Sequence, residues 1–142
     1  MRAAAALAAT LACLAPTIGH AAAPAGCRHP LTPVASSAAL PPAVAAPLKS
    51  WMALRGERWN ATDAIGRGDL TAGYLWAARS GPNWIVAYKV GGISCCSTRF
   101  ALLLPQGGRY VQAVPARARP DWFGDVSCAG VDAALAAYAE AR

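Results

Sequence analysis

The sequence is poor in histidine and in acidic residues. Its 142 residues include 2 histidines and 7 Asp and Glu, against 13 Lys and Arg. Beyond the first 21 residues a Ser-His-Asp or Cys-His catalytic site would have to use His29, which lies in a proline-rich segment. Acid–base chemistry would otherwise fall to the carboxylates of Asp63, Asp121 and Asp125. The composition therefore favours a protein that is not an enzyme, with a small hydrolase using these carboxylates as the alternative.

The chain also lacks a hydrophobic run long enough to cross a bilayer. The uncharged run at positions 3–15 is Ala- and Leu-rich, and a membrane span needs about 20 residues. Small residues precede a cut after Ala21, so residues 1–21 are predicted to be a cleavable secretory signal. Because the Ala- and Arg-rich composition is typical of a bacterium, the expected compartment is the periplasm. The alternative is a lipoprotein tethered through Cys13, because residues 11–13 resemble the end of a lipoprotein signal.

Beyond the signal the chain has four cysteines, Cys27, Cys95, Cys96 and Cys128. An even number of cysteines in an oxidising compartment predicts disulfides. Adjacent residues of a strand point to opposite faces, so Cys95 and Cys96 should each bond to a different partner. Cys96 falls on the side of the large apolar residues, under the helix that Cys128 begins. This parity predicts the pairs Cys96–Cys128 and Cys27–Cys95.

No C-x-x-C motif is present. A soft-metal or thiol site built from Cys95 and Cys96, with Cys27 and His29, is the alternative reading of the cysteines. A reactive pair beside two other cysteines should be trapped as disulfides, so no metal and no other cofactor is predicted.

The chain divides by composition into the signal, a Pro/Ala-rich extended segment at 22–41 and one domain at 42–142. Helical spacing places Val44, Leu48 and Trp51 on one face of a helix between positions 42 and 54. Alternating apolar residues between Gly-containing turns predict strands near 59–65, 74–79, 84–90, 98–104 and 110–114. A final helix runs from Ser127 or Gly130 to the end. The fold class is therefore α+β, an antiparallel meander of four to five strands with an N-terminal and a C-terminal helix packed on one face.

The net charge is positive, and the excess survives removal of the signal, which contains only Arg2 among the charged residues. An exported basic domain is attracted to anionic envelope components such as phospholipid or lipopolysaccharide phosphates. A proline-bounded segment contains Arg117 and Arg119 and leads directly to Trp122. Arginine and tryptophan are residue types that dominate interaction hot spots. These three residues are the predicted ligand-binding site, for an anionic envelope surface or envelope protein. No nucleic-acid partner and no transmembrane span are expected.

Two further motifs have plain structural interpretations. Trp59, Trp76 and Trp84 lie on the large-residue side of predicted strands, which is typical of core aromatics. The tripeptide at 67–69, Arg-Gly-Asp, is predicted to be a turn. The sequence thus favours an exported, disulfide-stabilised binding module; the alternatives are a small envelope hydrolase and a thiol or soft-metal handling protein.

Overall fold

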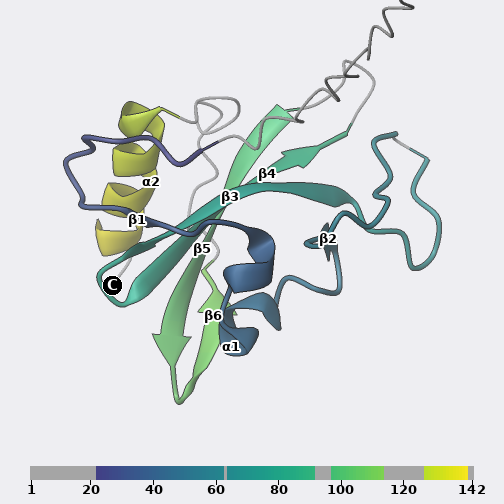
Figure 1. The fold of residues 1–142 in the computed structure, drawn as a ribbon, viewed down its shortest axis with the longest axis horizontal. Helices are drawn as coiled ribbons and strands as arrows, with labels where there is room; N and C mark the ends of the chain where they lie inside the picture. The colour runs from purple at the N-terminus through teal and green to yellow at the C-terminus, as the bar shows by residue number, and fades with distance from the viewer. Residues whose placement is uncertain (1–21, 63, 92–96, 114–126, 141–142) are drawn as a thin grey trace, which may run out of the picture.

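The computed structural model describes residues 22–62, 64–91, 97–113 and 127–140. Their centre is a twisted sheet that carries a long helix on one side and short helical turns on the other (Figure 1). In chain order the elements are β1 (Thr32–Pro33), η1 (Ser37–Ala39), α1 (Pro42–Ala45), β2 (Met52–Ala53), β3 (Ala72–Ser80), β4 (Asn83–Val90), β5 (Ser97–Gln106), β6 (Arg109–Gln112) and α2 (Cys128–Glu140).

The sheet is built on the meander β3–β4–β5–β6, in which every neighbouring pair is antiparallel. Tight turns at Gly81 and at Gly107 join the hairpins, and both glycines have a φ of 57°, a conformation that other residues adopt at a cost. The remaining edge of β3 is shared: β1 pairs antiparallel with its end and β2 pairs parallel with its start. The antiparallel sheet and the α+β class are therefore confirmed.

The two helices lie on opposite faces of the sheet, so the prediction that they share one face is wrong. Trp84 and Val86 of β4 belong to the cluster that contains Val44 of α1. Ile85, between them, belongs to the cluster that contains Val131 of α2. A strand buried on both faces needs no polar side, and β4 is apolar at consecutive positions for that reason.

The predicted N-terminal helix at 42–54 is reduced to the single turn of α1. Pro47 has no backbone N–H and crowds the preceding turn, which disfavours a continuing helix. The chain goes on through turns, in which Leu48 N–H donates to the carbonyl of Ala45, before it enters β2 at Met52. The predicted apolar face still points inward, because Val44 and Leu48 are completely buried.

The described residues of the predicted strand at 59–65 do not form a strand. The Asn60 side chain organises this segment instead: its amide donates to the Ala64 carbonyl and to Asp69, each at 2.7 Å. Its oxygen accepts from the backbone N–H of Thr62 at 2.9 Å. Asparagine side chains compete with backbone ladders in this way, and here they fold the chain into a closed loop.

Positions 67–69 form the predicted turn, with Gly68 at a φ of 87°. The Asp69 carboxylate accepts from Asn60 and from the backbone N–H of Gly66 at 2.8 Å. These hydrogen bonds, the one from Asn60 first, lower the pKa of Asp69. The carboxylate therefore serves the loop itself.

A bulge in β3 separates two aromatic residues that the sequence placed on one side. The register shifts between Tyr74 and Trp76, so Tyr74 packs with the α1 side of the core and Trp76 with the α2 side. Trp76 lies 5.8 Å from Phe100, ring centre to ring centre. Trp76 and Trp84 are 3% and 8% exposed, so the interpretation of these two as core residues is confirmed.

A disulfide joins Cys27 to Cys128 at the start of α2. The predicted pairs Cys96–Cys128 and Cys27–Cys95 are therefore wrong. Both pairs were predicted on the assumption that the sheet has one core face. The sheet has two, and β1 brings the N-terminal segment along the edge of β3 to the face that α2 covers. Cys95 and Cys96 themselves lie outside the described residues.

Beside the disulfide, Asp132 of α2 holds the same N-terminal segment. Its carboxylate accepts the backbone N–H groups of Arg28 at 3.0 Å and of His29 at 3.1 Å. His29 Nδ1 lies 2.8 Å from the same carboxylate. Burial raises the pKa of Asp132, but the hydrogen bonds from His29 and Arg28 together outweigh it and leave the pKa below its ordinary value. The disulfide and the Asp132 carboxylate together attach residues Cys27–His29 to α2, and we call this attachment the clasp.

Candidate functional site

The predicted ligand-binding residues Arg117, Arg119 and Trp122 lie outside the described residues. The same holds for Asp63, Asp121 and Asp125, the carboxylates of the hydrolase alternative. Their roles stay predictions, and the site must be built from the rest of the molecule.

The thiol and soft-metal alternative loses one of its proposed ligands. Cys27 is oxidised in the disulfide with Cys128, so it offers no thiolate. His29, whose side chain is 41% exposed, is directed to Asp132. In the part of the chain that the structure describes, no three His, Cys, Asp or Glu side chains are grouped as metal ligands.

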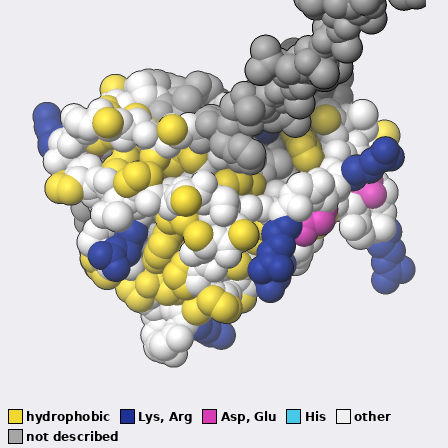
Figure 2. Space-filling view, in the orientation of Figure 1, with side chains coloured by type: hydrophobic (Ala, Val, Ile, Leu, Met, Phe, Trp, Pro, Cys, Tyr) yellow, Lys and Arg dark blue, Asp and Glu magenta, His cyan; other side chains and the backbone are white. Residues whose placement is uncertain are grey.

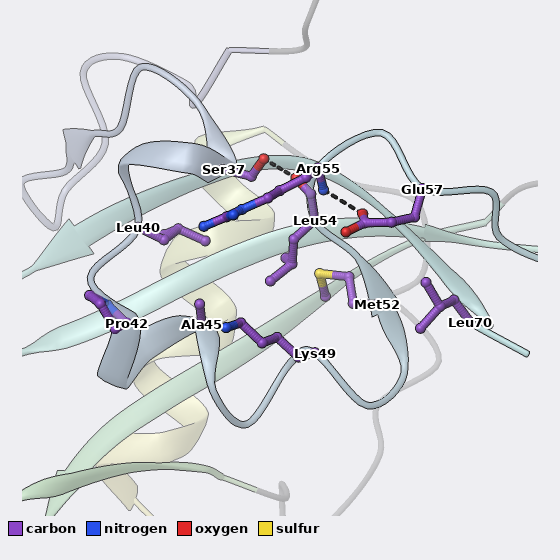
Figure 3. A pocket seen from close by; sticks show the side chains of 10 residues that line it. All are labelled: Ser37, Leu40, Pro42, Ala45, Lys49, Met52, Leu54, Arg55, Glu57 and Leu70. Atoms are coloured by element: carbon purple, nitrogen blue, oxygen red, sulfur yellow. Dashed lines mark hydrogen bonds between the residues drawn. The ribbon is translucent and has the colours of Figure 1, made fainter. Parts of the chain in front are cut away.

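A cleft of about 400 Å³ opens on the face that carries α1 (Figure 3). Its volume is in the range of small-molecule sites. The fold creates it because Pro47 ends α1 early, and the chain then turns back into β2 and leaves a space beside η1 and the loop before β3. Six apolar side chains line it: Leu40, Pro42, Ala45, Met52, Leu54 and Leu70.

Two basic side chains border the cleft. Lys49 comes from the turns after α1, and Arg55 is the second residue after β2. Figure 3 shows both side chains extending in the same direction along the cleft, with the nitrogen end of Arg55 beside Leu40 and that of Lys49 beside Ala45. Both are exposed, so they keep their hydration and remain available to a ligand. Neither forms a salt bridge with any carboxylate among the described residues.

Two hydrogen bonds fix the upper rim of the cleft. The Ser37 hydroxyl donates to the Leu54 carbonyl, and the Arg55 backbone N–H donates to the Glu57 carboxylate (Figure 3). The Arg55 N–H bond is the largest of the effects that lower the pKa of Glu57, and the Arg55 charge adds a smaller one. Glu57 is therefore an anion at neutral pH, so the rim carries two positive charges and one negative charge.

A second hollow of about 360 Å³ adjoins the cleft across Leu54, Arg55 and Glu57. Trp59, Gly73 and Tyr74 line its far side. Trp59 rests directly on Gly73, where a methyl group would overlap its indole ring. Burial raises the pKa of Tyr74 to about 12, so this phenol is neutral at physiological pH. Arg55 is the one basic side chain that lines both spaces.

The described charges are arranged unequally over the molecule. The three acidic side chains that the structure describes, Glu57, Asp69 and Asp132, all accept hydrogen bonds from their own chain. Every Lys and Arg side chain that it describes is exposed. On the face shown in Figure 2, basic side chains border an apolar centre on several sides, whereas acidic ones lie only at the right, beside basic ones.

Lys49 and Arg55 were not predicted as site residues from the sequence. Both fell within or beside the helix predicted at 42–54, where charged residues indicate a solvated face. Two signals in the sequence could have indicated them. Pro47, which ends a helix, precedes Lys49 by two residues, and Gly56, which favours a chain reversal, follows Arg55.

Comparison with known proteins found no matching family model, no matching curated protein and no matching solved structure. Among the helices described, none combines the length and the apolar character needed to cross a membrane.

Proposed function

We propose that this chain is an exported binding module without catalytic activity, and that its partner is an anionic component of the cell envelope. The observation that carries the proposal is the charge arrangement. The described carboxylates accept hydrogen bonds from backbone N–H groups of the same chain, and the described Lys and Arg side chains are all exposed. An anionic partner would meet an excess of exposed positive charge, which raises the association rate and the affinity at low salt.

The cleft on the α1 side supports the same function. It offers an apolar lining beside two cations, a combination suited to a partner that is both anionic and partly apolar. The predicted segment, Arg117 and Arg119 with Trp122, would supply further contacts of the same chemistry to that partner.

Export is supported by the predicted signal at 1–21 and, indirectly, by the Cys27–Cys128 bond, because disulfides persist in oxidising compartments. Mass spectrometry of the native protein should find an N-terminus at Ala22 or within two residues of it. A lipid-modified N-terminus at Cys13 would show that the exported protein is tethered to a membrane. An intact Met1 would contradict export.

The binding proposal is tested by cosedimentation of the native protein with phospholipid vesicles. Binding to vesicles that contain phosphatidylglycerol should exceed binding to pure phosphatidylcholine. It should fall steeply between about 0.02 M and about 0.5 M sodium chloride, because the Debye length shortens from tens of ångströms to a few. Equal binding to both vesicles, or no binding to either at the lower salt, would overturn the proposal.

A further inference from the structure

The cleft beside α1 differs from an ordinary surface depression in what lines it. Leu40, Met52 and Leu54 are all less than a tenth exposed and belong to the core cluster on this face. The cleft therefore opens onto the hydrophobic core itself. An apolar group that covers the exposed part of this lining removes it from water and gains free energy in proportion to the area covered.

The charged side chains at the rim of the cleft favour a ligand that has an anionic head group as well as an apolar chain. Lys49 and Arg55 extend in the same direction along the cleft, one as a compact ammonium and the other as a planar guanidinium (Figure 3). A guanidinium binds a carboxylate or phosphate through two parallel N–H bonds, and an ammonium adds a point charge. An oxyanion bound by these two cations would therefore lie next to the apolar lining.

From these two features we infer that the cleft is the binding site for a single-chain anionic amphiphile, with an alkyl or acyl chain on Leu40, Met52, Leu54 and Leu70 and a carboxylate or phosphate head between Lys49 and Arg55. The inference rests on the proposed function and adds to it the ligand class and the place where it binds. A neutral amphiphile would leave both cations without a partner.

A substitution at Glu57 can test whether the head group of the ligand is negatively or positively charged. Its carboxylate opposes an anionic head and would attract a cationic one, and it is bound to the Arg55 backbone at the same rim. Replacement of Glu57 by glutamine removes the negative charge and keeps an oxygen that accepts the Arg55 N–H. An anionic ligand should bind this variant more tightly, whereas a cationic ligand should bind it more weakly.

The experiment is isothermal titration of the native protein with decanoate, decyl sulfate, decyl maltoside and decyltrimethylammonium, each kept below its micelle concentration. The two anionic probes should bind and the neutral and cationic probes should bind at least about tenfold more weakly. Glu57→Gln should tighten decanoate binding about two- to threefold, the size expected for one exposed charge. Leu70→Ser should weaken all probes that bind, because Leu70 contributes to the chain site.

Two double variants with equal charge loss serve as site and control. Lys49→Ala with Arg55→Ala should weaken decanoate binding by about tenfold or more. Arg28→Ala with Lys89→Ala removes two cations that lie away from the cleft. Arg28 is held at α2 through its backbone, and Lys89 follows Ile85 and Ala87 on the α2 side of β4. This control should stay within about twofold of the parent protein.

Binding of decyl maltoside as tight as that of decanoate, or an equal loss in the two double variants, would overturn the inference. If no probe binds while phosphatidylglycerol vesicles still do, the ligand class is wrong and the proposed function stands. If neither the probes nor the vesicles bind, both are wrong.

Discussion

Cys27 and Cys128 stand 101 positions apart in the sequence and are joined by a disulfide that fastens the N-terminal segment to the start of α2. The bond closes a loop that contains the whole sheet. In the chain-entropy model a loop of that length contributes about 4.7 kcal/mol to stability. A small domain has about 5–15 kcal/mol in total, so this bond weighs heavily in whether the protein folds.

Replacement of either cysteine of this pair should therefore be costly. Cys27→Ser and Cys128→Ser should each lower the free energy of unfolding by about 2–5 kcal/mol, measured by urea denaturation under oxidising conditions. The double variant should lose no more than one single variant, because both remove the same bond. Additive losses, or a loss below about 0.5 kcal/mol in either single variant, would mean that the two cysteines are not bonded to each other in solution.

Asp132 predicts how stability responds to acid. Its pKa in the folded protein lies below the ordinary value because His29 and Arg28 hydrogen-bond the carboxylate. The folded state therefore binds this proton less readily than the unfolded state. The associated stability is fully present above about pH 4 and is lost as the pH falls through the lower folded value.

The test is urea denaturation of the parent protein and of Asp132→Asn across that acid range. The variant should be less stable at neutral pH and should lose less stability on acidification, so that the two curves converge at low pH. Parallel curves would show that Asp132 gains nothing from the clasp. The disulfide stays intact in both proteins, so the comparison isolates the carboxylate.

Trp59 and Gly73 make a close contact that can be tested by a mutant cycle. A methyl group at Gly73 would overlap the Trp59 indole, so Gly73→Ala should cost about 1–3 kcal/mol through overpacking. If the clash is with that ring, the cost should largely disappear in a Trp59→Ala background. An equal cost in both backgrounds would place the strain in β3 itself and contradict the contact.

The meander was predictable because its signals are local. Apolar runs between glycine turns specify β3 to β6, and α2 shows its buried residues Val131 and Leu135 at helical spacing. The layering was not predictable in the same way. A strand apolar at every position, as β4 is from Trp84 to Tyr88, carries no record of which helix covers which face.

Other errors have equally specific causes. At 59–65 alternation was outweighed by the hydrogen bonds of Asn60, and in β3 one bulge at Leu75 reversed the sides of the residues before it. The pairing of Cys27 with Cys128 depends on where two distant segments meet, which no local pattern encodes. The cleft was not predicted because Lys49 and Arg55 have no special spacing in the sequence. Only the chain reversal in the folded protein places both beside the same apolar space.

The most direct measurement compares the two charge-matched double variants on the same anionic vesicles. Lys49→Ala with Arg55→Ala and Arg28→Ala with Lys89→Ala each remove two exposed cations, so their net charges are equal. If the cleft meets the partner, the first variant should bind phosphatidylglycerol vesicles about tenfold more weakly than the second at low salt. Equal affinities would contradict a partner at the cleft, because only the net charge of the protein would then govern binding.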